Sequence, residues 1–418
     1  MLFRSGNLLL EAGRPASIDT LERAALRYPD DPEAWYTYGD ALFHLGIVRN
    51  IPGKRVAAAF DRAITVDPTF APAIIHGVTF AFLLDDSARA RRYVDQYTSL
   101  DSQSTLAMGI RAAVDLSWGT SQDSAAARRR LAAADPEAVI QTVINGLGWR
   151  WQTSRLAGEI AAPLRQAGAE DLRVFYYRGF FPRQLGLGRP REALRGLREG
   201  YRRLDRPGLR ALALILGAGG YVRPDEVRED LEAARGDTLD VSLWAQGVVE
   251  AAGRSGGGAD YARRLRDQAI RLRSAGDTLA AERRDGLAAG LEALARGFGA
   301  DHQGAIPPLR NAVERFGSGD FISFVVATTQ RLYLAAWLAE RPEGEQEALE
   351  ILHTTYLPFQ AQADQLAARI YERQGRKDEA AARYGRLIDQ WRDAEPGLQP
   401  AVAEARAALE RLTAEPRR

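Results

Sequence analysis

Helix-breaking residues recur through this 418-residue chain at intervals of about one short helix, and no other feature constrains its fold so strongly. The segments between these Gly and Pro positions are rich in Ala, Leu, Arg and Glu, and their apolar residues recur at spacings of three and four. No segment shows the sustained alternation of apolar and polar residues that is typical of a half-buried strand. The pattern therefore predicts an all-α protein of short helices joined by tight turns.

The clearest local pattern begins with an aromatic residue and a glycine. Trp35 precedes Gly39 by four residues, which on a helix places a bulky side chain one turn from a point of close approach. Phe60, Ala63 and Pro68 then supply an aromatic residue, a small residue three positions later and a helix-ending proline. These two segments resemble a tetratricopeptide repeat (TPR), a hairpin of two antiparallel helices.

Further copies of this pattern extend the resemblance along the chain. Tyr371, Ala380 and Tyr384 fall at the expected offsets, whereas the first copy carries about five extra residues, 49–54, in the turn between its helices. Weaker copies cover most of the remaining sequence. The resemblance implies an α-solenoid of antiparallel helical hairpins, a TPR-like right-handed superhelix with a concave groove, because one hairpin alone cannot bury both of its faces.

A glycine-rich stretch suggests where the predicted array divides. Residues 253–258 contain four glycines, which disfavour a helix there. We therefore expect an N-terminal TPR-like array over residues 6–252, a loop at 253–258, and a C-terminal array over residues 259–418 that ends in a capping helix.

The two ends of the chain carry a more particular resemblance. Residues 28–76 and 384–412 resemble the TPR tails that follow bacterial serine/threonine protein kinases, and similar tails occur on transcriptional regulators and cyclases. Residues 1–5 match the translation of a common sequencing adapter read from a GTG start. We interpret them as an assembly scar and expect the natural chain to continue upstream of Gly6, with a genuine start at Met1 as the alternative.

Composition and motifs argue against several classes of function. Lys and Arg total 56 against 55 Asp and Glu, so no global positive field favours a nucleic-acid partner. The absence of cysteine excludes disulfides, thiolate nucleophiles and Cys-ligated zinc. The sequence also lacks phosphate-binding loops, zinc-binding histidine pairs and nucleophile elbows, so we expect no catalytic residue, cofactor or metal in this chain. His44 and His76 can meet across neighbouring repeats, but we interpret them as ordinary, partly buried histidines.

No membrane segment is expected. The best apolar stretch, residues 209–222, is too short to span a bilayer and is interrupted by Arg210 and three glycines. Residues 8–10 are too few to form the apolar core of a signal peptide. The expected location is cytoplasmic, or extracytoplasmic if a missing upstream part carries a membrane span.

The densest aromatic group supplies the candidate partner contacts. These are Trp149, Trp151, Tyr176, Tyr177 and Arg178, which serve either as repeat core or as anchors for a bound protein. On one helix the two tryptophans, two positions apart, could not face the same way, so one is expected to reach the surface. The arginine runs at 128–130, 263–266 and 283–284 have acidic neighbours and are interpreted as solvated, salt-bridged helix faces.

These observations favour a non-catalytic scaffold that binds protein or peptide, as the interaction or sensor tail of a larger bacterial signalling protein. Because lysine and asparagine are scarce, we expect arginine and aromatic side chains to bind the partner. This favours acidic or internal peptide segments over chain ends as ligands. One alternative is a stand-alone enzyme with a dispersed active site around the central aromatic group, in which a residue such as Glu159, His302 or Asp320 acts as acid or base. Another is a self-association module in which the ends of the array stack on a second copy.

Overall fold

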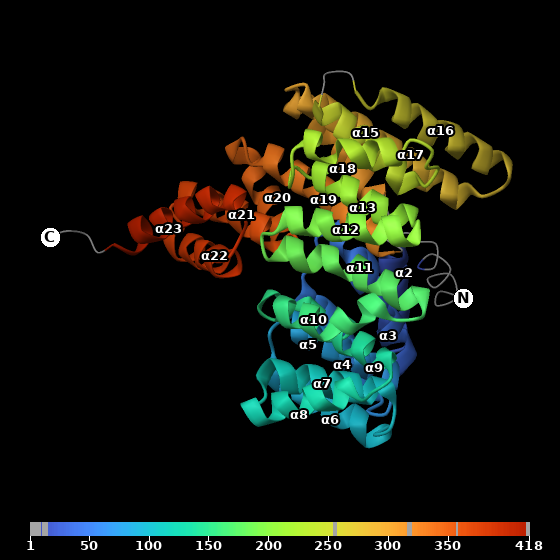
Figure 1. Ribbon diagram of the computed structural model, residues 1–418, viewed down its shortest axis with the longest axis vertical. Coiled ribbons are helices and arrows are strands. Elements are labelled where there is room, and N and C mark those ends of the chain that lie inside the picture. The colour runs from blue at the N-terminus through green and yellow to red at the C-terminus, as the bar shows by residue number, and fades with distance from the viewer. Residues whose placement is uncertain (1–9, 11–15, 254–256, 316–319, 357, 415–418) are drawn as a thin grey trace. The chain divides into compact units, whose positions relative to one another are not determined.

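A computed structural model of the protein describes residue 10 and residues 16–253, 257–315, 320–356 and 358–414 (Figure 1). Its contacts group into two compact units, one of residues 1–47 and 51–183 and one of residues 48–50 and 184–418. This division falls inside helix α11 (Glu170–Gly186). The proposed scar at residues 1–5 and residues 254–256 of the expected loop lie outside the described residues, so both remain predictions.

The described part of the first unit consists of helices and the turns between them, without a strand. Its α-helices before α11 are α2 (Ala16–Arg27), α3 (Pro32–Leu45), α4 (Gly53–Val66), α5 (Ala71–Leu83), α6 (Ser87–Leu100), α7 (Thr105–Trp118), α8 (Ser121–Ala132), α9 (Pro136–Ile144) and α10 (Ser154–Ala161). Four short 3-10 helices lie between them or before α11: η1 (Gly46–Arg49), η2 (Leu147–Trp149), η3 (Trp151–Thr153) and η4 (Ala162–Gln166).

The second unit is also built from helices alone in its described residues. Its α-helices are α12 (Pro190–Leu204), α13 (Pro207–Ala218), α14 (Arg228–Ala233), α15 (Asp240–Gly253), α16 (Ala259–Ser274), α17 (Thr278–Phe298), α18 (His302–Arg315), α19 (Phe321–Leu338), α20 (Glu345–His353), α21 (Gln360–Arg373), α22 (Lys377–Gln390) and α23 (Gln399–Thr413). Its 3-10 helices are η5 (Pro224–Val227), η6 (Pro342–Gly344) and η7 (Pro396–Leu398).

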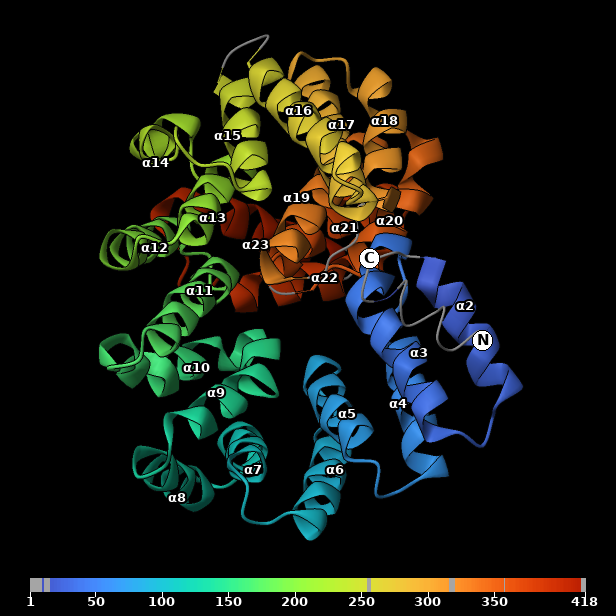
Figure 2. The same cartoon turned by 90° about the vertical axis from the view of Figure 1, so that its right-hand side faces the viewer.

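Within each unit, helices pack on the helices that precede and follow them in the sequence. In the first unit the contacts run from α2 through α3, α4, α5, α6 and α7 to α9, and in the second they run from α15 through to α23 (Figure 2). Short turns make the packed neighbours antiparallel. The fold is therefore an all-α solenoid of antiparallel helical hairpins, as the sequence predicts.

The TPR-like signature forms the hairpin of α3 and α4. Asp31 caps α3 by accepting hydrogen bonds from the backbone N–H groups of its first turn, at 3.0 and 3.4 Å. A Cβ atom on Gly39 would lie 2.8 Å from a ring carbon of Phe60, so only glycine allows the two helices to approach this closely. Phe60 and Ala63 are fully buried, and Pro68 lies in the turn before α5.

The structure also locates the insertion and the last copy of the TPR-like signature. Residues 46–49 form η1, so part of the lengthened turn between α3 and α4 is a 3-10 helix. In the second unit, Tyr371, Ala380 and Tyr384 are all buried between α21 and its neighbours. The Tyr384 hydroxyl donates to the carboxylate of Glu372 at 2.9 Å, which joins α22 to α21.

The second unit folds back on its own beginning. Gly188 has φ of +72°, and a Cβ there would lie 2.6 Å from Ala394 and 2.9 Å from the ring of Trp391. The N–H of Glu395 donates to the carbonyl of Gly188 at 2.9 Å, and the Gln390 side chain donates to the carbonyl of Gly186 at 2.8 Å. The turn after α22 is therefore held against the start of α12.

Helix α19 departs from the expectation about apolar stretches. It is 18 residues long with a mean hydropathy of 1.3, enough by length and composition to cross a bilayer, so residues 209–222 were wrongly taken as the best candidate. However, 67% of α19 is buried in this structure, as in the core helix of a helical array. Its Arg331 is 1% exposed and donates to the Thr354 hydroxyl at 2.7 Å, while burial lowers its pKa to about 9.

We expect Gly109→Ala to destabilise the first unit. A Cβ at Gly109 in α7 would lie 2.6 Å from Gln141 Cβ and 2.9 Å from the backbone oxygen of Ala138 in α9. Because backbone cannot move aside cheaply, unfolding in urea should show a loss of about 1–3 kcal/mol. Gly385→Ala in α22 is the matched control: its Cβ would meet nothing within 4 Å, so a gain of about 0.5–1 kcal/mol is expected. Equal effects of the two substitutions would contradict the packing argument.

Candidate functional site

The two predicted tryptophans lie in separate short helices. Trp149 ends η2 and Trp151 begins η3, so the expectation based on a single helix does not apply. Both side chains are partly buried. The indole N–H of Trp149 donates to the carbonyl of Ile144, and its ring lies 5.6 Å from that of Phe43. Trp149 therefore belongs to an aromatic group that includes α3.

The other predicted contacts lie on α11 and differ in accessibility. Tyr177 is 1% exposed and belongs to the core, whereas Tyr176 is partly buried and Arg178 is exposed. Arg183, seven residues beyond Tyr176, is 4% exposed, and its guanidinium lies 5.8 Å from the centre of the Tyr176 ring. Burial lowers the pKa of Arg183 to about 10. The face of α11 that carries Tyr177 is therefore unavailable to a partner.

The three candidate acids and bases are held by structural partners. Glu159 is exposed in the first unit and pairs with Arg128 at 3.1 Å. In the second unit, His302 lies 2.7 Å from Glu340, and Asp320 caps α19 through two backbone N–H groups. Burial would raise the pKa of Asp320, but the hydrogen bonds from Ser323 and Ile322 and the charge of Arg283 together outweigh this effect and lower it. No group of three His, Asp or Glu side chains in the described ranges is placed to hold a metal ion.

Helix α12 of the second unit carries seven charged residues among its fifteen. One face is apolar and buried, formed by Ala193, Leu194, Leu197, Gly200 and Tyr201. Pro190 occupies the first turn, and the carboxylate of Glu395 accepts hydrogen bonds from the backbone N–H groups of Arg191 and Glu192, at 3.2 and 2.9 Å. This carboxylate compensates the positive end of the helix dipole. The opposite face of the helix presents arginines.

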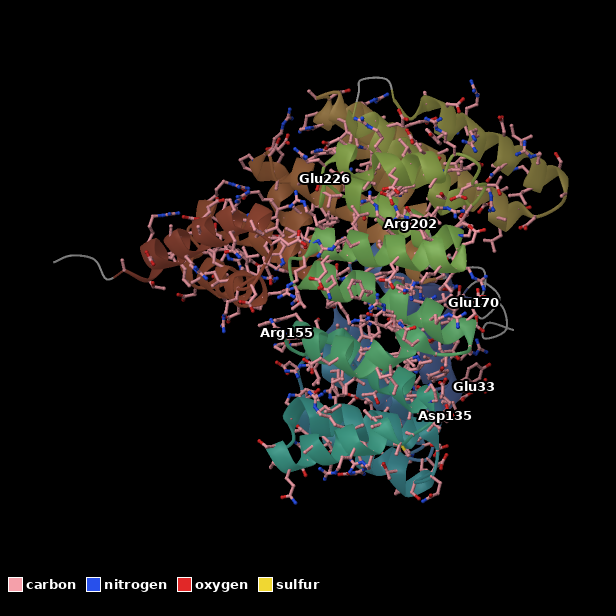
Figure 3. All side chains as sticks on the ribbon, in the orientation of Figure 1. Glu33, Asp135, Arg155, Glu170, Arg202 and Glu226 are labelled. Carbon is pink, nitrogen blue, oxygen red and sulfur yellow. The ribbon has the colours of Figure 1, made fainter. Side chains whose placement is uncertain are left out.

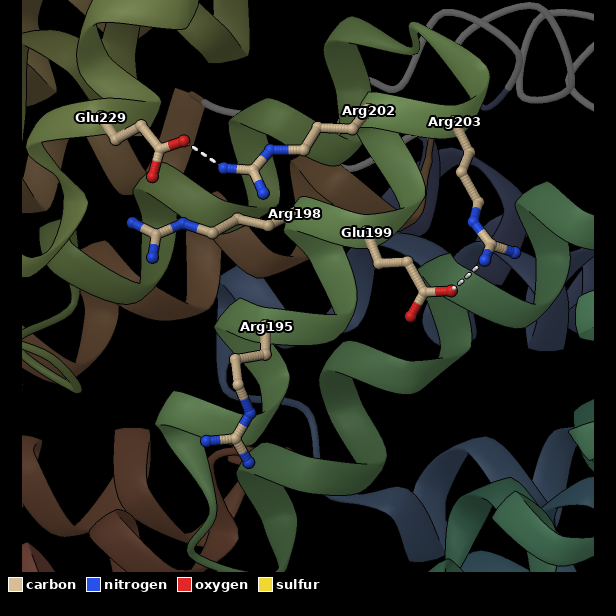
Figure 4. Close-up of a pocket in the computed structure, with 6 residues that line it drawn as sticks. All are labelled: Arg195, Arg198, Glu199, Arg202, Arg203 and Glu229. Atoms are coloured by element: carbon tan, nitrogen blue, oxygen red, sulfur yellow. Dashed lines mark hydrogen bonds and ion pairs between the residues drawn. The ribbon is translucent and has the colours of Figure 1, made fainter.

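Two shallow clefts lie along this arginine face. The first, of about 510 Å³, is lined by Arg195, Arg198, Glu199, Arg202, Arg203 and Glu229 (Figure 4). The second, of about 550 Å³, is lined by Arg189, Arg191, Glu192, Arg195, Asp393, Ala394, Glu395 and Pro396. Arg195 lines both clefts, so it stands where they meet.

Carboxylates engage the other arginines of the clefts. Arg202 and Glu226 of this region are labelled in Figure 3. The pairs are Arg189–Glu192 at 3.7 Å, Arg191–Glu226 at 2.6 Å, Arg198–Asp230 at 2.6 Å, Arg203–Glu199 at 3.3 Å, and Arg202–Glu229. The hydrogen bond from Arg191 lowers the pKa of Glu226.

The Arg198–Asp230 pair has a structural role in this site, because it holds α12 in place. Asp230 is fully buried and receives both the fork of Arg198 and the Tyr201 hydroxyl, the latter at 2.9 Å. Burial, with the nearby Asp230 charge, raises the pKa of Tyr201 to about 12. A buried carboxylate with these three hydrogen bonds fixes α12 against the segment that carries α14.

Arg195 is the exception in this set. It is exposed, and no carboxylate of the described chain lies within ion-pair distance of it. In Figure 4 its guanidinium extends away from the Arg202–Glu229 and Arg203–Glu199 pairs. Five guanidinium N–H groups in a planar fork are thus left for an external acceptor at the junction of the two clefts.

The sequence contains a signal for this site that our interpretation missed. Arginines at 191, 195, 198 and 202 recur at spacings of four, three and four, which places them on one helix face. Three of these arginines pair with carboxylates that reach α12 only through tertiary packing, namely Glu226, Glu229 and Asp230. Spacing in the sequence therefore does not show which arginine is left without a carboxylate partner.

Comparisons with known proteins give only distant likenesses. No protein-family model matches the chain, and no curated protein is similar to it. Among solved structures, yeast Tom70 is 12% identical, with 97% of this chain and 94% of that chain covered and a TM-score of 0.32. The TPR domain of P58(IPK) is 14% identical with 99% of both chains covered and a TM-score of 0.24. The hetero-tetramer of Cut9 and Hcn1 contains a chain that is 13% identical, with coverage of 99% and 89% and a TM-score of 0.26. Likenesses at this level carry no argument about function.

We expect Asp230→Ala to destabilise the second unit strongly, because it leaves Arg198 and Tyr201 without their buried acceptor. The expected loss in the free energy of unfolding is about 3–5 kcal/mol. The adjacent Glu229→Ala is the control, since Glu229 is 58% exposed and its pair with Arg202 should contribute less than about 1 kcal/mol. Denaturant unfolding measures both, and comparable losses would refute the assignment of Asp230 as the structural carboxylate.

Proposed function

We propose that this chain is a non-catalytic protein-binding scaffold and that the clefts on α12 hold an acidic segment of the partner. The observation that carries the proposal is Arg195, an exposed arginine without a carboxylate partner at the junction of two arginine-lined clefts. A planar guanidinium pairs a carboxylate through two parallel hydrogen bonds, which gives both affinity and orientation.

The surrounding ion pairs support an acidic partner rather than a basic one. Arg202 and Glu229 are 56% and 58% exposed, and Arg203 is 49% exposed, so these pairs are solvated and weak. An arriving carboxylate can therefore recruit a second arginine at little cost. The clefts are open and shallow, which suits an extended segment lying along the helix rather than a small molecule enclosed in a pocket.

The resemblance of the chain ends to kinase tails supports a proposal for the wider setting. We propose that the chain is the interaction or sensor tail of a larger bacterial signalling protein and works in the cytoplasm. In this arrangement any catalytic domain lies in another part of the protein, and Glu159, His302 and Asp320 have the structural roles described above.

A charge-reversal experiment tests the proposal. Fluorescence anisotropy should show that labelled hexaglutamate binds the chain, that hexaglutamine does not, and that added salt weakens the complex by screening. Arg195→Glu should weaken binding about tenfold or more, since it replaces the unpaired donor by a repelling charge.

Arg406→Glu in α23 is the matched control. Arg406 is exposed in the same unit but lines neither cleft, so its reversal changes net charge equally. Sedimentation should first show that both variants keep the association state of the original chain. An equal loss of binding in the two variants would mean that overall charge, not the α12 site, attracts the peptide, and the proposal would fail.

A further inference from the structure

Asp40 of α3 is a carboxylate whose ion-pair partners are two histidines rather than an arginine. Its side chain is 23% exposed, and its carboxylate oxygen lies 3.3 Å from Nε2 of His44 and 3.5 Å from Nε2 of His76. No arginine or lysine of the described residues pairs with it, although arginine–carboxylate pairs are abundant elsewhere in the structure. The two histidines therefore do meet, with a carboxylate between them.

The orientation of His76 makes this arrangement unfavourable without a further group. Nδ1 of His76 lies 3.0 Å from the carbonyl oxygen of Pro72, which can only accept, so Nδ1 carries the hydrogen. Burial lowers the pKa of His76 and outweighs the raising effects of the Pro72 carbonyl and of Asp40, which favours the neutral ring at pH 7. In that neutral tautomer the lone pair of Nε2 faces the Asp40 carboxylate, and two acceptors confront each other.

Aromatic rings lie against the two histidines that face this carboxylate. The Tyr36 ring lies 5.5 Å from His76, and the Phe43 ring lies 4.8 Å from His44 and 5.8 Å from His76. Burial, with the Asp40 charge, raises the pKa of Tyr36 to about 12. Tyr36 and Phe43 are partly buried, so a portion of each remains accessible. A partly accessible carboxylate close to aromatic side chains is the chemistry that attracts a cation.

We infer that Asp40, with Tyr36, Phe43 and His76, binds the guanidinium of an arginine side chain presented by a partner protein. The planar guanidinium can donate to the Asp40 carboxylate and to the facing Nε2 of His76, which removes the repulsion between these two acceptors. It can also stack on the neighbouring rings, which a compact lysine ammonium does less well. This site belongs to the first unit and takes the opposite charge from the α12 clefts, so it does not depend on the proposed function.

Proton NMR of the histidine rings provides the test, because the chain has only four histidines. Titration with N-acetyl-arginine amide at about pH 8, where imidazoles are neutral, should shift the signals of His44 and His76 and leave those of His302 and His353 in place. The uncharged analogue N-acetyl-citrulline amide should produce no such shift. Assignment comes from single His→Gln variants.

Two variants separate the site from general surface charge. Asp40→Asn should weaken the binding of N-acetyl-arginine amide about tenfold or more, since it keeps the shape and removes the charge. Asp30→Asn, at a side chain that is 96% exposed in the same unit, should leave the titration unchanged. If Asp40→Asn fails to fold by circular dichroism, Phe43→Leu should still weaken binding through loss of the ring face. Equal responses to arginine and citrulline, or an unchanged titration in Asp40→Asn or in a folded Phe43→Leu, would overturn the inference. The result is independent of hexaglutamate binding at Arg195.

Discussion

A helical hairpin cannot bury both of its faces alone, and this constraint determines the arrangement of each unit. Every helix needs a neighbour on each side, and the nearest candidates are the helices before and after it in the chain. Close approach at the contact points then depends on small residues. Gly39 against Phe60 and Gly109 against α9 show the same solution, in which the missing Cβ sets the distance between the helices. Helix α19, packed on several neighbours, is mostly buried and is accordingly apolar in most of its sequence, with Arg331 as a buried exception.

Arginine–carboxylate pairs form a second layer of organisation on top of this packing. Many of them join different helices, such as Arg266–Glu292 between α16 and α17 and Arg310–Glu347 between α18 and α20. A single exposed pair contributes little to stability. Pairing of this extent places the 56 basic and 55 acidic residues next to one another, so neither sign produces a strong electrostatic field. Against this background an unpaired charge becomes informative. Arg195 has no carboxylate of the described residues within ion-pair distance, and Asp40 pairs with histidines rather than with an arginine or lysine of those residues. The two charges have opposite sign and lie in separate units.

Arg195 and Asp40 differ in how much of their surroundings could be predicted from the sequence. The helical spacing of the arginines in residues 191–202 is visible without a structure, and it predicts one basic face. The carboxylates that neutralise most of this face come from residues 226–230, outside the helix, so the one unpaired arginine could not be identified from spacing. Asp40 is harder to identify from the sequence, because its local context is that of an ordinary surface aspartate. Its distinguishing feature is the Nε2 lone pair of His76, from the next repeat, which faces the carboxylate only in the folded structure. Trp149 was predicted as a contact, but its neighbour Phe43 lies far away in the sequence.

The sequence by itself determined the all-α class, the helical hairpins and the residues of the TPR-like signature, because these depend on helical periodicity, on turn-forming glycine and proline, and on local spacing. Only the tertiary structure decided which side chains remain accessible and which charges remain unpaired. Tyr177 and Tyr176 are adjacent in an aromatic run, yet one is buried in the core and the other is partly accessible. Arg195 and Arg198 lie one turn apart, yet only Arg198 meets a buried carboxylate. Accessibility and pairing depend on residues that packing brings together from distant parts of the chain, and local periodicity carries no information about them.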